Sequence, residues 1–261
     1  MKLLIKIGGT LLDGEDSRRQ IASGIAGAVR AGHKIVLVHG GGKQMTRFLA
    51  ERGVESRFVE GLRVTTDEVL DAVLKVFAGA VNKQLVAALI GCGVKAVGLS
   101  GIDGSLVEAE PLRADLGHVG RPTRSDPRLL NCLIDAGYVP VVACVAGDRG
   151  GRIFNVNADQ MAVACAIGFQ PESLIFLTDV DGVLDGDKRP LPRLSLKESQ
   201  ALIDNGIATG GMLAKLRAAG EALRHGVGQV VIAPGSTPGV LSTLLAGAEA
   251  GTRLCRERSN G

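Results

Sequence analysis

Two similar stretches decide the fold of this chain: Leu3-Leu4-Ile5-Lys6-Ile7-Gly8-Gly9 and Ile35-Val36-Leu37-Val38-His39-Gly40-Gly41-Gly42. Each is an apolar run typical of a buried strand, and each ends directly in glycines. A helix-like segment separates them, so we expect a βαβ unit with a glycine turn at the carboxyl edge of both strands. Glycine has no Cβ, so its N–H can approach a ligand closely, and ligands of open parallel sheets sit at this edge. The pattern favours a site for a phosphate or carboxylate.

The bulk composition fits a soluble globular protein and argues against nucleic acid as a partner. The chain has 261 residues, with 46% hydrophobic and 22% charged side chains. That length allows one large α/β domain or two fused lobes. The net charge of +3 is small, and one Tyr with no Trp leaves little to stack on bases.

The cysteines and the beginning of the sequence indicate a cytoplasmic protein with no membrane partner. The five cysteines form no CxxC pair, and their odd number suggests free thiols in a reducing compartment. The opening residues lack the layout of a signal peptide. No apolar run in the sequence approaches the roughly 20 residues that a membrane-spanning helix needs.

Alternating strand and helix patterns predict an α/β fold, a three-layer αβα sandwich around a mainly parallel sheet. Residues 67–90 should form the longest helix, with an apolar face of period 3.6 that could serve a subunit interface as well as the core. The other helices are expected at residues 17–31, 42–52, 127–136, 158–168, 196–205, 212–225 and 240–245. Further strands are expected at residues 96–99, 106–110, 118–121, 139–145, 174–178, 229–232 and 251–254, the last at a sheet edge, with a hairpin at 58–65.

A turn-rich connection at residues 147–152 suggests where two lobes meet on one continuous sheet. We expect an N-terminal lobe at 1–150, for acyl substrate binding and dimerisation, and a C-terminal lobe at 151–261, for ATP binding. The polar tail at 256–261 is expected to be frayed.

The common phosphate-binding motifs are absent from the sequence. Gly42-Lys43 is followed by Gln44, so no GxxxxGK[ST] motif exists, and no GxGxxG follows a strand. These absences argue against a P-loop NTPase and a Rossmann dehydrogenase.

Several charged or polar residues stand at the ends of the predicted strands and helices. Lys6 lies inside an apolar strand, where a lysine is costly unless it is paired, so we interpret it as an anion ligand or one member of a structural salt bridge. Lys215 lies one turn into a helix that follows glycines, a position that by itself is usually solvated. His39 precedes glycines and is assigned a structural role.

Two polar segments and one arginine complete the set of candidates. Asn157 should cap a helix and place Asp159 in its first turn, which leaves Asn155 unexplained. Asp179-Val180-Asp181-Gly182 follows a strand at the same sheet edge and fits a metal pair or a nucleotide-contacting turn. Arg63 could grip a carboxylate with two hydrogen bonds.

Taken together, the motifs resemble the amino acid kinase family and, within it, the acetylglutamate kinases of arginine biosynthesis. The resemblance runs from Lys2 to about Leu254. It rests on six short motifs in family order: Lys6-Ile7-Gly8-Gly9, Val38-His39-Gly40-Gly41-Gly42, Gly61-Leu62-Arg63-Val64-Thr65, Asn155-Val156-Asn157-Ala158-Asp159, Leu177-Thr178-Asp179-Val180 and Gly210-Gly211-Met212-Leu213-Ala214-Lys215.

The resemblance implies transfer of a phosphoryl group from ATP, with Mg²⁺, to the γ-carboxylate of N-acetyl-L-glutamate. Lys6 and Lys215 would stabilise the phosphoryl group and Asp159 would orient both lysines. By the same resemblance, the acyl substrate and transferring group would contact Gly41, Gly42, Arg63 and Asn155. The nucleotide would contact Gly8, Gly9, Asp179, Val180, Asp181, Gly182, Val183, Leu184, Ile207, Ala208 and Thr209. The residues themselves agree with this chemistry, since an ionised carboxylate needs positive charge rather than a general base.

Two departures and two alternatives accompany the resemblance. Lys43 stands where the family commonly has proline or a small residue. The chain starts at its first strand, without the N-terminal helix that some members use for hexamers and arginine feedback, so we expect an arginine-insensitive homodimer built on the helix at 67–90. The two main alternatives are a kinase of carrier-protein-bound aminoadipate or glutamate in lysine biosynthesis, and a catalytically silent regulator that binds acetylamino acids. Other amino acid kinases, which act on aspartate, free glutamate, carbamate or UMP, share the glycine turns but match the Arg63 segment poorly. A silent regulator would be expected to lose one of the catalytic residues, and Lys6, Lys215 and Asp159 are all present.

Overall fold

The structure, a computed structural model, describes residues 1–256. Apart from Arg256, the tail that was expected to fray lies outside the described residues. The strands are β1 (Lys2–Ile7), β2 (Lys34–His39), β3 (Phe58–Val59), β4 (Leu62–Arg63), β5 (Ala96–Ser100), β6 (Val107–Pro111), β7 (Val119–Ser125), β8 (Val139–Ala143), β9 (Val145–Gly147), β10 (Ile153–Val156), β11 (Ser173–Thr178), β12 (Arg193–Ser195), β13 (Gln229–Pro234) and β14 (Thr252–Cys255).

The α-helices are α1 (Glu15–Arg30), α2 (Gly42–Ala50), α3 (Asp67–Val73), α4 (Asn82–Gly91), α5 (Arg128–Asp135), α6 (Ala158–Phe169), α7 (Leu196–Asp204), α8 (Gly210–Arg224) and α9 (Val240–Leu245). A π-helical segment, η2 (Leu74–Val81), joins α3 to α4. Short 3₁₀ turns are η1 (Gly9–Leu12), η3 (Asp103–Ser105) and η4 (Ala114–Leu116).

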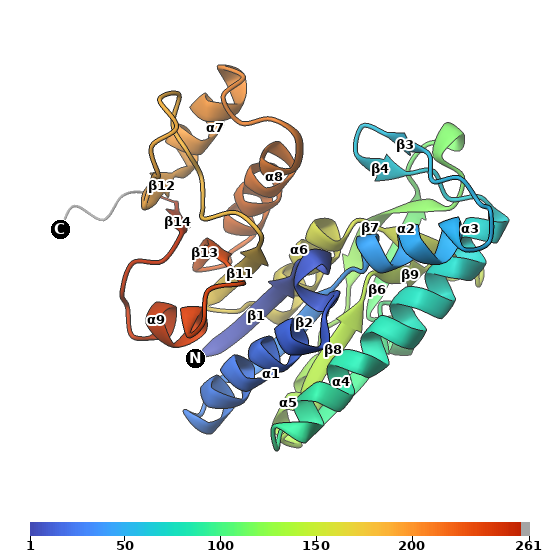
Figure 1. Cartoon of the computed structure of the whole chain (residues 1–261), viewed down its shortest axis with the longest axis horizontal. Coiled ribbons are helices and arrows are strands. Elements are labelled where there is room, and N and C mark those ends of the chain that lie inside the picture. Colours follow the sequence, from blue (N-terminus) through green and yellow to red (C-terminus); the bar gives the residue numbers. More distant parts are fainter. Residues whose placement is uncertain (257–261) are drawn as a thin grey trace.

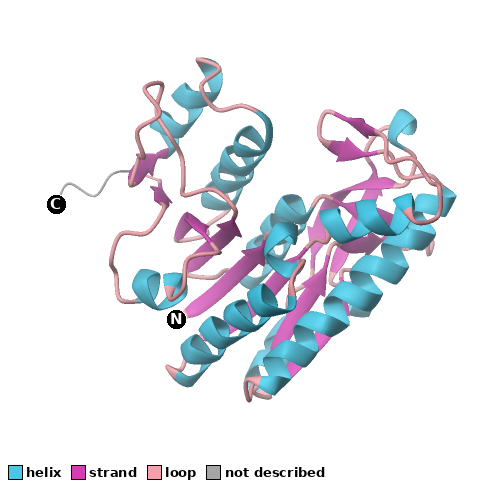
Figure 2. Cartoon of the chain, in the orientation of Figure 1, coloured by secondary structure: helices cyan, strands magenta, loops and turns pink. Residues whose placement is uncertain are grey.

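The main sheet has eight strands in the order β12-β14-β13-β11-β1-β2-β8-β5. Its neighbouring strands are parallel except for β13 and β14, which run antiparallel. Helices cover both faces: α1 contacts α4 and α9, whereas α6 contacts β1, β2 and α8. Figure 1 shows α1 and α4 side by side on the near face of the sheet, and Figure 2 shows the helices that flank the strands. The expected mainly parallel sandwich is therefore confirmed.

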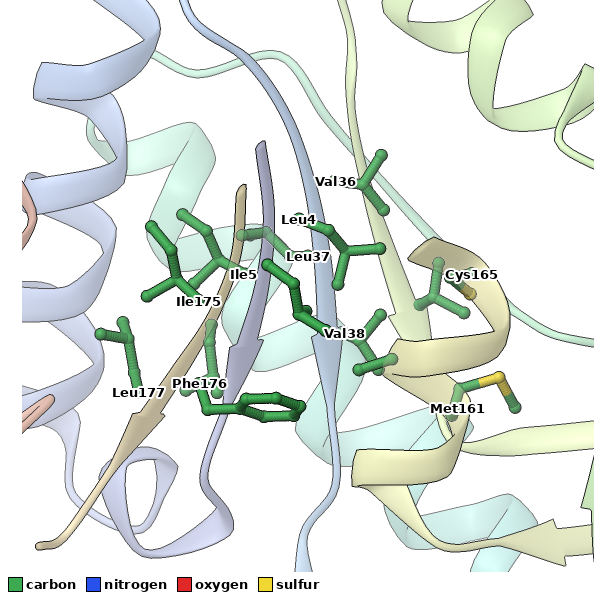
Figure 3. Close-up of a cluster of buried hydrophobic side chains, with 14 of the residues drawn as sticks. Leu4, Ile5, Val36, Leu37, Val38, Met161, Cys165, Ile175, Phe176 and Leu177 are labelled. Carbon is green, nitrogen blue, oxygen red and sulfur yellow. The ribbon is translucent and has the colours of Figure 1, made fainter. Parts of the chain in front are cut away.

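One hydrophobic core joins the first and last strands of the sheet. Its cluster of buried side chains runs from Leu3 in β1 to Leu254 in β14. At its centre β1 pairs with β2 and β11, so its side chains are enclosed from both sides and both faces. Figure 3 shows Leu4 and Ile5 of β1 among side chains of β2, β11 and α6. This continuous packing places the carboxyl ends of β1, β2 and β11 next to one another.

The strand predictions fail where the chain changes sheets. The single strand expected at 139–145 is interrupted at Cys144, because β8 stays in the main sheet and β9 enters a second, closed sheet of β10, β7, β6 and β9. The short strands β10 and β12 were not predicted. The strand expected at the edge, 251–254, is β14, which is flanked by both β12 and β13.

The longest helix is continuous from Asp67 to Gly91, but it is not a regular α-helix. Its middle is the π-helical η2, so the single period of 3.6 expected there is wrong, and Ala80, expected on the buried face, is exposed. By length and composition alone this helix could cross a membrane, which contradicts the expectation of no such run in the sequence. A core helix passes the same test, and Val73, Phe77 and Leu85 lie in the core cluster.

The expected division at residues 150 and 151 falls in the turn between β9 and β10. These two strands pair with each other, and β10 also pairs with β7, so the described backbone is hydrogen-bonded across the division. The eight-stranded sheet likewise contains strands from both sides of it. The assignment of one function to each lobe remains a proposal.

Candidate active site

Lys6 lies near the carboxyl end of β1, the central strand of the sheet. It is paired in register with Phe176 of β11 and Val38 of β2, and only 7% of its surface is exposed. A buried ammonium group needs an opposite charge. Its Nζ lies 2.8 Å from Oδ1 of Asp159. Of the two interpretations offered for Lys6, the salt bridge is present in the structure, and its partner is another candidate site residue.

Asp159 is held in place by the start of α6. The Asn157 side chain caps this helix and accepts hydrogen bonds from the backbone N–H groups of Asp159 and Gln160, as the sequence predicted. Burial alone would raise the pKa of Asp159, but Lys6 and Lys215 outweigh it and hold the pKa below its ordinary value. Asp159 is therefore ionised at neutral pH.

Lys215 approaches the same carboxylate from α8. Its Nζ donates to Oδ2 of Asp159 at 3.4 Å, and its side chain is 15% exposed. Among residues 1–256, Asp159 is the only carboxylate within ion-pair distance of either lysine. Two ammonium groups thus share one negative charge. This lysine–aspartate cluster (Lys6, Asp159 and Lys215) carries a net positive charge, which suits an anionic ligand.

The two glycine turns meet beside this cluster. A Cβ placed on Gly9 would lie 3.0 Å from the backbone nitrogen of Gly42 and 3.4 Å from that of Gly41. A Cβ on Gly8 would lie 3.2 Å from the carbonyl oxygen of Leu177, the atom to which Gly8 donates its own N–H. Only glycine fits between these backbones without displacement. The expected grouping of backbone amides at the sheet edge is therefore present.

Arg63 lies at the end of the β3–β4 hairpin, which was predicted at this place. It is 9% exposed, and burial lowers the pKa of its guanidinium. It donates to Oγ of Ser56, to Oγ1 of Thr46 at 2.9 Å and to the carbonyl of Gly42 at 3.3 Å. Within the described part of the chain no carboxylate pairs with it. A buried guanidinium bound only to neutral groups is suited to a carboxylate ligand.

Asn155 and Arg63 are linked through Thr65, a residue that sequence reasoning did not single out as a ligand-site residue. Nδ2 of Asn155 donates to Oγ1 of Thr65 at 3.0 Å, and that hydroxyl donates to the carbonyl of Arg63 at 2.9 Å. Thr65 is fully buried. The only feature of the sequence that could have pointed to Thr65 was its position two residues after Arg63.

The predicted nucleotide segments form a separate group beyond β11. Asp179, Val180, Asp181 and Leu184 are exposed, whereas Gly182 and Val183 are buried. In the second segment Ile207 and Thr209 are exposed and Ala208 is buried. A Cβ on Gly186 would lie 3.6 Å from Cδ1 of Ile207, so the loop that follows the first segment approaches the second.

The first nucleotide segment is bound to β14 through Thr252, a residue that no pattern in the sequence singled out. Its hydroxyl accepts from the N–H of Val183 at 2.8 Å and donates to the carbonyl of Leu191 at 2.6 Å. A Cβ on Gly182 would lie 2.8 Å from the same hydroxyl. Such a partner, far away in the sequence, becomes visible only once β14 is placed.

Two buried residues near the glycine turns, Cys144 and His39, are poorly suited to act as a nucleophile or general base at neutral pH. Burial raises the pKa of the Cys144 thiol to about 12, and burial lowers the pKa of His39 to about 4. Among residues 1–256 no three His, Cys, Asp or Glu side chains gather as a metal site, so Asp179 and Asp181 have no third such ligand beside them. What remains is positive charge and backbone amides, which can bind and stabilise phosphoryl and carboxylate oxygens.

Comparison with known proteins agrees with this arrangement. The model of the amino acid kinase family matches residues 1–234. An acetylglutamate kinase of Solibacter usitatus is 63% identical over 97% of this chain and 99% of that protein. An acetylglutamate kinase of Acidobacterium capsulatum is 44% identical over 94% and 95%, respectively.

A solved structure extends the likeness to three dimensions. N-acetylglutamate synthase from Neisseria gonorrhoeae, complexed with coenzyme A and N-acetyl-glutamate, superposes with a TM-score of 0.88 and 30% identity. The match covers 99% of this chain but only 60% of that synthase. With a family model over most of its length and near-full-length relatives, this chain belongs to the amino acid kinase family.

Proposed function

We propose that this protein transfers the γ-phosphoryl group of ATP to the γ-carboxylate of N-acetyl-L-glutamate, a step of arginine biosynthesis. The observation that carries the proposal is the lysine–aspartate cluster beside the glycine amides, which combines a net positive charge with N–H donors. The names of the two full-length relatives support the choice of acyl acceptor.

The chemistry requires charge stabilisation and alignment rather than proton transfer. A γ-carboxylate with a pKa of about 4.3 is already ionised at neutral pH. One of its oxygens attacks the γ-phosphorus of ATP, the bond to the β,γ-bridging oxygen breaks, and ADP leaves with that electron pair. The obstacle is the approach of one anion to another. Lys6 and Lys215 offset the charge on the phosphoryl oxygens, and Asp159 keeps the two ammonium groups at a fixed spacing.

The glycine turns would supply the remaining donors around the phosphoryl group. The backbone nitrogens of Gly41 and Gly42 lie beside Gly9, where an added Cβ would come within 3.4 and 3.0 Å of them, respectively. Mg²⁺ supplies further charge neutralisation when it is bound with the nucleotide. Because the described residues offer no cluster of three metal ligands, the nucleotide phosphates would be its main ligands.

Arg63 and Asn155 are proposed to hold the α-carboxylate side of the acyl substrate. Arg63 has a preorganised guanidinium without a carboxylate partner among residues 1–256, and Thr65 connects it to Asn155. For the nucleotide, the exposed apolar side chains of Val180, Leu184 and Ile207 offer contacts to an adenine ring, with Asp179, Asp181, Gly182, Val183, Ala208 and Thr209 around them.

The partner and compartment expected from the sequence are also proposals. A homodimer through residues 67–90 is supported by the apolar window of this helix, of which 39% is buried within one chain, and by Ile90, which is 57% exposed. Light scattering should give twice the monomer mass, and a charged substitution at Ile90 should reduce it. A monomeric wild-type protein would refute the dimer. The five free cysteines support a reducing compartment such as the cytoplasm.

The deciding experiment traps the acyl phosphate with hydroxylamine in the presence of ATP and Mg²⁺. N-acetyl-L-glutamate would be compared with free glutamate and free aspartate. We expect a hydroxamate with the acetylated substrate alone. No product with any of the three, from protein shown to be folded, would reject the proposal and favour a carrier-protein-dependent kinase or a silent binding protein.

A further inference from the structure

His39 is a fully buried titratable residue to which the proposed reaction assigns no task. It is the last residue of β2, has 0% exposure, and directly precedes the glycine triplet, residues 40–42. A buried imidazole in a strand requires partners for both ring nitrogens. Its two partners connect the glycine triplet to the long helix.

The hydrogen bonds of His39 define which ring nitrogen carries the proton. Nδ1 lies 2.8 Å from the carbonyl oxygen of Gly40, and a carbonyl oxygen can only accept. Nδ1 of the neutral ring is therefore protonated and donates. Nε2 then has a free lone pair, and it lies 3.0 Å from Nδ2 of Asn82, which donates to it. The neutral ring thus satisfies both contacts, whereas a protonated ring would oppose the Asn82 amide with a second donor.

Asn82 has its side-chain orientation fixed by three further groups. It is 1% exposed, and its Nδ2 also donates to the carbonyl of Val141 in β8 at 2.9 Å. Its Oδ1 accepts from Nζ of Lys83 at 3.2 Å. A Cβ on Gly98 of β5 would lie only 1.9 Å from this Oδ1, so the strand leaves space for the amide by having glycine there. The amide therefore presents an N–H to His39 and cannot be turned over without losing the bond to Val141.

Two side chains that precede Asn82 in the long helix pack against the glycine triplet. A Cβ on Gly41 would lie 2.9 Å from Cδ1 of Phe77 and 3.2 Å from Cγ2 of Val81. Both side chains belong to η2, the π-helical part of the long helix. The end of the π-helical segment thus packs against Gly41, and Asn82, the residue that follows it, donates a hydrogen bond to His39. Such π-helical turns are frequent at functional sites.

We propose that His39 and Asn82 are positioning residues that hold the amides of the glycine triplet toward the transferring phosphoryl group. This inference rests on the proposed kinase function. The carbonyl of Gly40 and the N–H of Gly41 belong to one planar trans peptide, in which they point in opposite directions. The bond from Nδ1 of His39 to the carbonyl therefore fixes the direction of the Gly41 N–H, whose nitrogen would lie 3.4 Å from a Cβ on Gly9.

Two substitutions of His39 separate its two bonds. In His39→Asn, the shorter amide can keep a donor near the position of Nδ1 but loses the acceptor for Asn82. In His39→Gln, the longer amide can keep an acceptor near the position of Nε2 but loses the donor to Gly40. The positioning role predicts that His39→Gln loses roughly tenfold to a hundredfold in kcat, with KM values within threefold. His39→Asn should retain the larger share of kcat although it loses more thermal stability.

Ser100→Ala serves as the matched control. It removes a different, partly buried hydrogen bond at the end of β5, from Oγ of Ser100 to Asp103, and should leave kcat unchanged. A merely structural His39 would lower kcat in both variants only in proportion to their loss of folded protein. Equal kcat for His39→Gln and wild type, with all variants folded at the assay temperature, would overturn the proposal.

A second readout does not depend on the substrate assignment. Hydrogen exchange of the Gly41 amide, followed by NMR on glycine-labelled protein, should accelerate at least tenfold in His39→Gln and less in His39→Asn. Unchanged Gly41 exchange in His39→Gln would reject the positioning role even if the wild-type protein is an active kinase. If Gly41 exchange accelerates in His39→Gln but the wild-type protein does not phosphorylate acetylglutamate, the proposed substrate is rejected. The inference that His39 fixes the Gly41 amide then still holds.

Discussion

Lys6 and Lys215 share a buried carboxylate, whereas Arg63 is held by two hydroxyls and a carbonyl and has no carboxylate partner among residues 1–256. Both ends of the site therefore keep positive charge for an anion, but they do so by different means. The lysine–aspartate cluster depends on one charged residue that serves two others. The Arg63 end depends on several neutral contacts, each of which is worth less. We expect the two ends to respond differently to the loss of one group.

The largest effect should follow the replacement of Asp159 by Asn. This change leaves two buried ammonium groups without their counter-charge, and breaking a buried pair costs about 3–5 kcal/mol of stability. Turnover should fall by about three orders of magnitude as the lysines lose their spacing. Urea unfolding and steady-state kinetics measure the two effects. Asp135→Asn, which removes an exposed partner of Lys34, is the control and should change neither.

Lys215→Ala should separate catalysis from stability at the same end. Asp159 keeps its ion pair with Lys6, so stability should change little, while kcat falls by two to three orders of magnitude. Calorimetry should find acetylglutamate binding within a few-fold of wild type. The exposed Lys34→Ala is the control. Near-normal turnover in Lys215→Ala would mean that the lysine has no part in phosphoryl transfer.

The pH dependence of stability should report on buried titratable groups beside the glycine triplet and in the lysine–aspartate cluster. His39, behind the glycine triplet, has a pKa of about 4 in the folded protein and about 6.5 when unfolded, so below pH 6.5 the unfolded state binds more protons. Its contribution to stability is complete above pH 6.5 and is lost as the pH falls to 4, by up to about 3 kcal/mol. Lys83 is the charged neighbour that adds to this shift. When the free energy of unfolding, measured with urea, is plotted against pH, it should fall less steeply between pH 6.5 and 4 in His39→Asn than in wild type.

Asp159 continues this trend at lower pH. Its folded pKa lies below its unfolded value of about 3.9, so its stabilising contribution is present above that value and is lost as the pH falls through the folded pKa. Asp159→Asn should lack this acid-dependent loss.

For His39, a wild-type protein equally stable at pH 7 and pH 4.5 would contradict the buried, neutral state of the ring.

At the other end, Arg63→Lys should raise the KM for acetylglutamate by about tenfold and lower kcat less. The substitution keeps a positive charge but loses the planar fork that binds a carboxylate with two hydrogen bonds. Arg113→Lys, at an exposed arginine paired with Asp115, is the control and should leave the KM unchanged. A KM unaffected by Arg63→Lys would remove Arg63 from the substrate site.

The smallest effect is expected from Thr46→Val. Its hydroxyl accepts from Nη2 of Arg63 at 2.9 Å, while Ser56 and Gly42 still hold the same guanidinium. Losing one such bond costs about 1 kcal/mol, so the KM should rise only several-fold. A rise as large as that of Arg63→Lys would show that this end also depends on a single contact, and the comparison between the two ends would fail.

The sequence predicted the parts of the fold that local pattern controls. The strand–glycine turns at Gly8 and Gly40, the hairpin at Arg63 and the cap at Asn157 all follow from residue types over a few positions. The meeting of Lys6, Asp159 and Lys215 was expected from the family resemblance, because spacing along the chain cannot bring together three residues from different elements.

Other features were missed because they depend on contacts between distant segments. The strands β10 and β12 are short and are stabilised by pairing rather than by their own pattern. The η2 segment has an ordinary apolar sequence, and its π-helical geometry accompanies packing of Phe77 on Gly41. Asn82 looked like any polar residue on a helix, and Thr252 like any residue of an edge strand.

The position of β1 in the sheet has a consequence for how the protein is made. Of the strands that the structure describes, β1 leaves the ribosome first, yet one of its two neighbours, β11, comprises residues 173–178. β1 must therefore wait for the synthesis of β11 before its second edge is covered, and Lys6 must wait for α6 before it meets Asp159. Such long-range pairing slows folding and leaves a hydrophobic edge open meanwhile. The catalytic centre should therefore assemble late, and truncated chains that end before residue 173 should aggregate rather than fold.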